Sequence, residues 1–450
     1  MIRPEIFKAN DIRGVFTGPE VEWDLDGARA IGAAFAVAFN LADAEFVMGR
    51  DMRTGGPELA AAFAEGAVGQ GASAIDIGLA STDELWFASG HLDIPGVQFT
   101  ASHNPAKYNG VKFCRAAAAP ITPEQMARIT ELSFVALPPV ARVGSRRELD
   151  LLGAYADRLH SLVDTTGMRR LKVVVDAGNG MAGHTTPAVL APLNVELIEL
   201  FTDLDGSFPN HPPNPLEPAN LVDAQRAVRE HGADIALVFD GDADRCFIID
   251  ERGEVVSPSS ITALIARAEL AREPGGTIVV NSITSRAVAE VVTAAGGQVA
   301  VSTVGHTKMK ALMAQTNAIF GGEHSAHYYF RDFWRADTGM LAALHVLAML
   351  GRAGSVSALV SELPTYAASG EINTSVSDPR GTMEQVADAL GGRGEVSWSD
   401  GLLINAEDWW VSVRESNTEP LLRLNVEAKD EATVAALRDA ALAIIRKERG

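Results

Sequence analysis

Apolar runs of strand length alternate with helical patterns along most of the chain. An Ala-rich apolar pattern predicts a helix over residues 24–39, and the run 45–51 predicts a strand that ends in a polar turn. A second helix over 57–69 and a second strand over 73–78 repeat the alternation. Because strands that alternate with helices build parallel sheets, we expect an α/β domain here.

The alternation returns twice further along the chain, and the C-terminal part differs from it. The further segments are helices over 151–163, 220–231, 257–271 and 286–295 and strands over 171–176, 235–239, 246–250, 277–280 and 299–301. Strands over 409–414 and 421–428 flank a polar loop, and a helix over 431–446 closes the chain. This last part predicts a smaller α+β unit.

The length of 450 residues is too great for a single core. The segment 136–147 breaks both periodicities and predicts a linker, and Pro364 suggests another boundary. We therefore expect three consecutive α/β domains with mixed or parallel sheets and a smaller C-terminal α+β domain. The predicted domains cover residues 1–142, 143–250, 251–364 and 365–450.

Composition and charge narrow the class of protein. With 47% hydrophobic and 21% charged residues, the chain is typical of a soluble globular protein. Its net charge of −20 argues against a nucleic-acid or anionic-membrane partner, because phosphate groups would be repelled. Two cysteines cannot build a disulfide framework. Since residues 1–8 lack the apolar core of a signal peptide, we expect a cytoplasmic protein.

Ser102 and His103 follow a short strand over 96–100 and precede Asn104-Pro105. A hydroxyl beside an imidazole on such a turn is a possible nucleophile, and in parallel sheets functional groups gather at the carboxyl ends of strands. The alternative is an ordinary turn or helix cap, which the same residues also favour.

The most informative stretch joins the strands over 235–239 and 246–250. Asp240, Asp242 and Asp244 alternate with small residues and would repel one another unless a cation neutralised them, which indicates a hard divalent metal. An EF-hand is excluded because its sixth position needs glycine and this chain has Arg245 there. A guanidinium at this point suits phosphate binding. A solvated acidic turn is the alternative.

Residues 178–183 match the glycine pattern of dinucleotide-binding turns. That pattern should open a long helix, yet Pro187 and Pro192 leave room only for a short one. Glu196 and Glu199 lie near the spacing of a ribose contact, so an NAD(P)-binding oxidoreductase remains an alternative.

Several further polar groups are weaker candidates, each with a surface turn or ion pair as the alternative. Glu323, Ser325 and His327 alternate after a double glycine, which suits the binding of sugar hydroxyls. The loop between the last two strands, with Arg423 returning toward it, predicts an anion cradle. Arg13 stands two residues after Asp11, and His306 lies in a predicted loop beside Lys308.

Taken in order, four motifs resemble those of the phosphohexomutases, and most of all their bacterial phosphomannomutase/phosphoglucomutase branch. The motifs are Thr-Ala-Ser-His-Asn-Pro at 100–105, Asp-Gly-Asp-Ala-Asp-Arg at 240–245, Gly-Glu-His-Ser-Ala at 322–326 and Arg-Glu-Ser-Asn-Thr-Glu-Pro at 414–420. Together they span nearly the whole chain. The resemblance implies three α/β domains of shared topology and a smaller fourth domain around one central cleft.

The resemblance also implies a role for each candidate residue. Ser102 would be the phosphoserine, and with Asp240, Asp242 and Asp244 it would hold Mg²⁺. The residues implied to surround the reacting group are Arg13, His103, Lys112, Arg245 and His327. Those implied to bind the sugar are His306, Glu323 and Ser325. The phosphate that is not transferred would be bound by Arg414, Ser416, Asn417, Thr418 and Arg423.

The implied reaction interconverts hexose 6-phosphate and hexose 1-phosphate, with mannose first and glucose close behind. A hexose 1,6-bisphosphate would form and turn over between two transfers, and the protein would be a monomer or a weak homodimer. The chain departs from its relatives at Lys8-Ala9-Asn10, near Ile283 and at His324, all of which concern substrate contacts. A phosphoglucosamine mutase is the nearest alternative, and a non-catalytic sugar-phosphate-binding protein is another.

Overall fold

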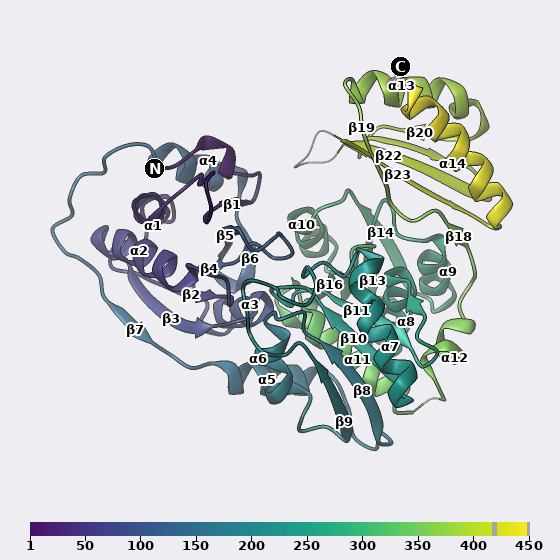
Figure 1. Ribbon diagram of the computed structural model, residues 1–450, viewed down its shortest axis with the longest axis horizontal. Helices are drawn as coiled ribbons and strands as arrows, with labels where there is room; N and C mark the ends of the chain where they lie inside the picture. The colour runs from purple at the N-terminus through teal and green to yellow at the C-terminus, as the bar shows by residue number, and fades with distance from the viewer. Residues whose placement is uncertain (353, 416–420, 448–450) are drawn as a thin grey trace.

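The computed structural model describes residues 1–352, 354–415 and 421–447, which form four β-sheets with helices packed on them. Figure 1 shows the N-terminal unit at one side, the second and third units in contact beside it, and the C-terminal unit above the third unit. The predicted fold class of three α/β units and a smaller α+β unit is confirmed.

The first sheet has the strand order β1-β5-β4-β2-β3-β7, with β6 beside β5. Strands β2, β3, β4 and β7 are parallel, whereas β5 runs antiparallel to β4 and β1. Its elements are β1 (Asp11–Val15), α1 (Leu25–Ala38), β2 (Glu45–Arg50), α2 (Gly56–Gly69), β3 (Ser73–Leu79), α3 (Thr82–Leu92), β4 (Gly96–Phe99), β5 (Tyr108–Arg115), β6 (Ala119–Pro120), α4 (Pro123–Leu132) and β7 (Arg146–Glu148).

The second sheet has the order β12-β11-β10-β8-β9, with β8, β9 and β10 parallel and β11 antiparallel to β10. Strand β10 is buried along its whole length, as expected for a central strand covered on both faces. The elements are α5 (Leu152–Leu162), β8 (Leu171–Asp176), α6 (Ala182–Val189), β9 (Val195–Leu200), α7 (Val222–His231), β10 (Ile235–Phe239), β11 (Cys246–Asp250) and β12 (Val255–Val256).

The third sheet has the order β14-β13-β15-β16-β17, and it changes from parallel to antiparallel pairing between β15 and β16. The elements are α8 (Pro258–Arg272), β13 (Thr277–Asn281), α9 (Arg286–Ala294), β14 (Gln298–Ser302), α10 (His306–Thr316), β15 (Phe320–Gly322), β16 (Tyr328–Phe330), β17 (Ala336–Asp337), α11 (Gly339–Leu350) and α12 (Val356–Ser361).

The fourth sheet has the order β18-β23-β22-β21-β20, with β19 beside β23, and neighbouring strands in its described part are antiparallel. Helices α13 (Pro379–Leu390) and α14 (Glu431–Ile445) pack against it (Figure 1). The elements are β18 (Ala367–Ala368), β19 (Ile372–Ser375), α13 (Pro379–Leu390), β20 (Glu395–Ser397), β21 (Leu402–Asn405), β22 (Trp409–Glu415), β23 (Leu421–Ala428) and α14 (Glu431–Ile445).

The expected strands and helices agree with this order, and the domain boundaries stay predictions. Strand β7 pairs with β3, so the first sheet continues beyond residue 142, and β12 likewise joins the second sheet beyond residue 250. The sequence patterns did not predict α3, α4, α10, α12 and α13. Among the described residues, no helix combines the length and apolarity needed to cross a bilayer.

Helices α1 and α2 pack closely because two glycines face the opposite backbone. A Cβ on Gly66 would lie 1.9 Å from the carbonyl oxygen of Arg29, and one on Gly32 would lie 2.0 Å from that of Phe63. Such contacts cannot be relieved by rotating a side chain. The short distance between α1 and α2 therefore requires glycine at positions 32 and 66.

Gly66→Ala should destabilise the protein by about 1–3 kcal/mol, because the two helices must move apart around the new methyl group. The matched control is Gly69→Ala in the same helix, where a Cβ would meet nothing within 4 Å. There the substitution should be neutral or stabilise by up to about 1 kcal/mol, through better helix propensity. Urea unfolding of both variants provides the test, and equal midpoints would contradict the packing argument.

Candidate functional site

Three candidate loops occupy the same place in three different sheets. In each sheet the loop follows the carboxyl end of a strand that has one parallel neighbour, and it leads into an antiparallel strand. The serine loop lies between β4 and β5, the aspartate loop between β10 and β11, and the sugar loop, residues 323–327, between β15 and β16. Functional groups of α/β sheets gather at this end of the strands.

Ser102 is buried and has a left-handed backbone conformation, with φ of +50°. Its N–H donates to Thr100 Oγ1 at 2.8 Å, and its hydroxyl donates to Asp240 Oδ2 at 3.0 Å. The imidazole of His103 lies 3.3 Å from the same hydroxyl through Nδ1. Burial, together with Arg245 and Arg13, lowers the pKa of His103 well below its usual range, so this imidazole is neutral at pH 7.

Arg53, which the sequence analysis missed, fixes the serine loop. Its guanidinium is buried and donates to the carbonyl oxygens of Ser102 and Asn104, both at 2.7 Å. It also donates to the carbonyls of Pro105 and Tyr108. Five N–H donors in a planar fork suit such a role. Arg13 reaches the loop from β1 by donating to Asn104 Oδ1 at 2.9 Å.

The aspartate loop brings together the three carboxylates that the sequence singled out. Asp240, Asp242 and Asp244 are buried, and one oxygen atom from each lies within 4.8 Å of the others. Ala243 turns the loop with φ of +60°. Arg245, also buried, donates through Nε to Asp240 Oδ2 at 2.8 Å.

Lys112 enters this group from β5 of the first sheet. Its ammonium donates to Asp242 Oδ2 at 2.6 Å and to Asp244 Oδ2 at 2.7 Å. Burial raises the pKa of Asp242, but the ammonium and its hydrogen bond lower it by more, so the net pKa lies below the usual range. Burial and the other two carboxylates raise the pKa of Asp240, although Arg245 opposes this effect.

The residues of the aspartate loop fit a hard divalent cation. Asp242 Oδ1 and Asp244 Oδ1 are buried and have no hydrogen-bond partner within the part of the chain that the structure describes. Burying such an oxygen without a partner is costly. Two convergent carboxylates that each keep one oxygen free of hydrogen bonds are therefore suitable ligands for an oxygen-preferring metal ion.

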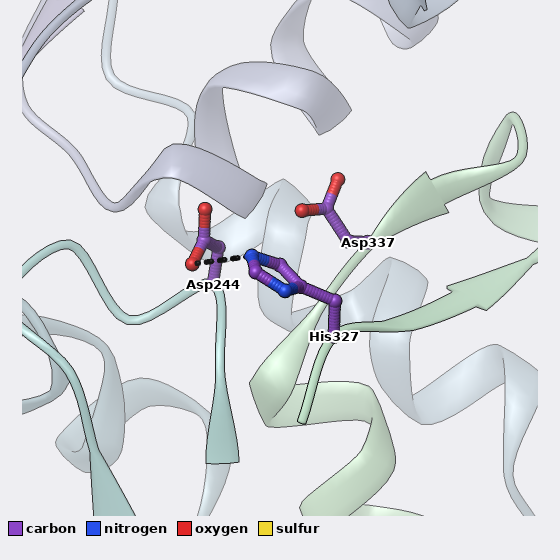
Figure 2. Close-up of side chains that lie close together, drawn as sticks. All are labelled: Asp244, His327 and Asp337. Atoms are coloured by element: carbon purple, nitrogen blue, oxygen red, sulfur yellow. Dashed lines mark ion pairs between the residues drawn. The ribbon is translucent and has the colours of Figure 1, made fainter. Parts of the chain in front are cut away.

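The sugar loop lies directly against the aspartate loop. Figure 2 shows the imidazole of His327 beside Asp244 and Asp337, and its Nε2 lies 3.7 Å from Asp244 Oδ1. The hydroxyl of Ser325 is 2.9 Å from the other ring nitrogen. Glu323 is buried, and it accepts a hydrogen bond from Tyr329 at 3.0 Å. Thus Glu323, Ser325 and His327 do come together beside the three carboxylates of the aspartate loop.

His306 is placed differently from the expectation. It is the first residue of α10, so it begins a helix rather than lying within a loop. Burial and the nearby ammonium of Lys310 lower its pKa to about 3. Lys308 is exposed, whereas Lys310 is buried and lies 3.1 Å from Asp337. The buried ammonium of this helix is therefore that of Lys310.

The anion cradle is described in part. Arg414 on β22 and Arg423 on β23 are paired across the fourth sheet, and both lie near the carboxylate of Glu371. Arg414 Nη2 is 3.4 Å from Glu371 Oε2, and Arg423 Nη1 is 3.3 Å from Oε1. Ser416, Asn417 and Thr418, which were also predicted here, lie outside the described residues.

The glycine-rich turn at 178–183 packs against protein. A Cβ on Gly180 would lie 2.6 Å from the carbonyl oxygen of Gly241, and one on Gly183 would lie 2.1 Å from that of Thr202. In a dinucleotide-binding turn the second glycine faces the pyrophosphate. Here the aspartate loop takes that place, and α6 is as short as its prolines predict. The turn therefore supports the aspartate loop.

Helix α3 is the main element that the sequence analysis missed. Its first residue, Thr82, donates to Asp242 Oδ2 at 2.6 Å. The sequence does contain a signal for the start of this helix, because Ser81-x-x-Glu84 is the pattern of a capping box. In the structure Ser81 caps the helix by accepting a hydrogen bond from the N–H of Glu84. Helix α10 has no such signal, since Gly305 at its start has no side chain to cap it.

Comparison with known families gives four matches along the chain. The family models are domain I of phosphoglucomutase/phosphomannomutase over residues 4–135, domain II over 153–253, domain III over 257–366 and the C-terminal domain over 371–444. A phosphomannomutase of Salmonella montevideo is 39% identical over 445 residues, covering 96% of each chain. A phosphomannomutase of Escherichia coli K12 is 37% identical over 457 residues, covering 98% of this chain and 99% of its own.

Solved structures agree with these matches. A phosphoglucomutase/phosphomannomutase family protein from Burkholderia thailandensis has a TM-score of 0.90 at 33% identity, covering 100% of this chain and 98% of its own. An N-acetylphosphoglucosamine mutase from Aspergillus fumigatus, solved with GlcNAc-6P and magnesium, shares the fold with a TM-score of 0.58 at 15% identity, over 82% of this chain and 93% of its own. This chain belongs to the phosphoglucomutase/phosphomannomutase family and is an enzyme that transfers phosphoryl groups as a mutase.

Proposed function

We propose that the protein interconverts hexose 6-phosphate and hexose 1-phosphate, with mannose and glucose as sugars, through a phosphoserine at Ser102. The observation that carries this proposal is the hydrogen bond of 3.0 Å between the Ser102 hydroxyl and Asp240 within the three-carboxylate group. The imidazole of His103 also lies 3.3 Å from this hydroxyl, but the hydroxyl donates to Asp240, a candidate ligand of a cation. Such surroundings favour a serine that carries a phosphoryl group.

Charge balance explains why a divalent cation is needed. Three buried carboxylates face the cations Lys112 and Arg245, and a phosphoserine would add a charge of about −1.5 to −2. Ser102, Asp240, Asp242 and Asp244 would hold Mg²⁺, which when bound neutralises charge on the phosphoryl oxygens. The magnesium in the Aspergillus fumigatus mutase is consistent with this assignment.

In the first transfer, a sugar hydroxyl would attack phosphorus, the bond to Ser102 Oγ would break, and the hydroxyl proton would pass to a base of the site. His103 and His327 are the candidates for this base, whereas the ammonium of Lys112 donates to Asp242 and Asp244 and cannot accept a proton. A hexose 1,6-bisphosphate results, and after it turns over the second transfer returns a phosphoryl group to Ser102. Glu323 and Ser325 would bind the sugar hydroxyls, and Arg13 and Arg245 would stand beside the reacting phosphate.

The other phosphate would be held by the C-terminal unit. Arg414 and Arg423 are the described parts of this cradle, and Ser416, Asn417 and Thr418 are proposed to complete it. Burial lowers the pKa of His324 in the sugar loop, while Glu371 raises it and Arg414 lowers it. His306 is proposed to contact the sugar. The cytoplasmic location and the state of monomer or weak homodimer stay predictions.

The wild-type protein should convert mannose 1-phosphate and glucose 1-phosphate to the 6-phosphates, given Mg²⁺ and a trace of glucose 1,6-bisphosphate. Ser102→Ala should lower kcat by about three orders of magnitude or more, because no group remains to carry the phosphoryl group. A coupled assay measures turnover, and kcat/KM for the two sugars gives the preference.

The control is Ser133→Ala, which removes another buried hydroxyl, one that donates to Ile129 in α4. It should retain full activity. Intact-mass measurement after incubation with the bisphosphate should show one added phosphoryl group on the wild-type protein and none on Ser102→Ala. Absence of turnover on mannose, glucose and glucosamine phosphates alike would refute the proposed reaction.

Glu371→Gln should tighten binding of glucose 1-phosphate about two- to fivefold. In the structure this carboxylate lies between both cradle arginines, so an arriving phosphate would have to displace or share it. The expected gain corresponds to one partly exposed ion pair, about 0.5–1 kcal/mol. Isothermal titration with the sugar phosphate measures the change.

Glu362→Gln, which affects an exposed ion pair with Arg267 of α8 and not the cradle arginines, is the matched control and should leave affinity unchanged. Weaker binding by Glu371→Gln would mean instead that the carboxylate orients the arginines for the phosphate.

A further inference from the structure

We propose that Thr82 is a positioning residue for the metal site, because it holds one oxygen of Asp242 and thereby directs the other toward the cation. This inference rests on the proposed metal-binding role of the aspartate loop. Thr82 lies 160 residues from Asp242 in sequence and belongs to a different sheet unit.

Two hydrogen bonds join the start of α3 to this aspartate. The buried hydroxyl of Thr82 donates to Asp242 Oδ2 at 2.6 Å, and its backbone N–H donates to the carbonyl oxygen of Asp242 at 2.9 Å. The backbone and the side chain of Thr82 are thus both held in place. The N–H at the first turn of a helix has no partner within the helix, so this contact also satisfies α3.

Because of this contact, the two carboxylate oxygens of Asp242 have different roles. Oδ2 of Asp242 accepts from both Thr82 and Lys112, each at 2.6 Å. Oδ1 is buried and has no hydrogen-bond partner among the described residues. Two donors on one oxygen fix the rotation of the carboxylate about its Cβ–Cγ bond. A carboxylate that rotated freely could turn either oxygen toward the cation. The carboxylate held by these two donors directs Oδ1 toward it.

Helix α3 is itself held by neighbours from two other units. The next residue, Asp83, is fully buried and accepts hydrogen bonds from Tyr155 of α5 at 2.7 Å and from Thr338, which precedes α11, at 2.6 Å. Ser81 also donates to the Asp83 carboxylate. Because α3 is anchored on this side, Thr82 cannot follow Asp242 if the aspartate loop moves. The hydroxyl therefore acts as a fixed reference point.

Groups that orient a metal ligand commonly change metal affinity by 10- to 100-fold when they are removed. Thr82→Val replaces the hydroxyl by a methyl group of similar size. It should weaken Mn²⁺ binding to the full-length protein about tenfold, since Lys112 still holds Oδ2. Thr82→Ser keeps the hydroxyl and should bind Mn²⁺ as the wild-type protein does.

The experiment is a Mn²⁺ titration, followed by electron paramagnetic resonance, of wild type, Thr82→Val, Thr82→Ser and Tyr155→Phe without sugar phosphate. Tyr155→Phe is the matched control, because it removes a buried hydroxyl from the same junction without touching Asp242. It should lower the melting temperature and leave Mn²⁺ affinity unchanged. In the activity assay, Thr82→Val should raise the Mg²⁺ concentration needed for half-maximal rate about tenfold and reach a near-normal kcat at saturation.

The outcomes separate this inference from the proposed function. If the wild-type protein binds no Mn²⁺, the proposed metal site fails and Thr82 loses its role with it. If the wild-type protein binds Mn²⁺ and Thr82→Val binds it equally well, only the positioning role fails. Equal losses in Thr82→Val and Tyr155→Phe would also overturn it, by showing a general effect of the junction. If Thr82→Val does not fold, Thr82→Ala replaces it with the same expectation.

Discussion

The mutual repulsion of three buried carboxylates is the constraint on which the rest of this protein depends. At the separation of Asp240, Asp242 and Asp244, each like-charged pair is unfavourable by roughly 3 kcal/mol at an effective dielectric constant near 20. One compensating cation, Arg245, comes from the same loop, but Lys112 comes from the first sheet. The second unit therefore cannot bury its carboxylates without the first unit, so the site and the interface between these units are one feature.

The shared position of the loops explains how distant segments meet. In each of the three α/β units, a strand with one parallel neighbour ends in a loop that leads into an antiparallel strand. The loop therefore projects from one defined edge of the sheet. At the closest approach, a Cβ on Gly241 would lie 2.5 Å from the carbonyl oxygen of Ser102. A side chain of any size at Gly241 would push the serine loop away from the aspartate loop. Each unit thus supplies one chemical component, and close backbone packing assembles them.

The sequence predicted what depends on local pattern. The alternation of acidic residues at 240–244 and the flanking apolar runs are complete within a dozen positions, so both the strands and the candidate ligands were found. Thr82, Arg53 and Glu371 were missed because their partners are tens of residues or more away in sequence. No local sequence pattern distinguishes these three side chains from other surface or core residues. The start of α3 at Ser81 carried a local signal, whereas the start of α10 at Gly305 carried none.

The charge of −20 and a site for sugar phosphates are compatible because the cations of the site already have anionic partners within the protein. Lys112 is paired with Asp242 and Asp244, Lys310 with Asp337, and Arg414 with Glu371. Binding a phosphate here would therefore exchange one anion for another, and its free energy would be a difference between two sets of ion pairs. Such an exchange limits affinity, which would suit the proposed reaction, since the proposed bisphosphate intermediate would have to turn between transfers.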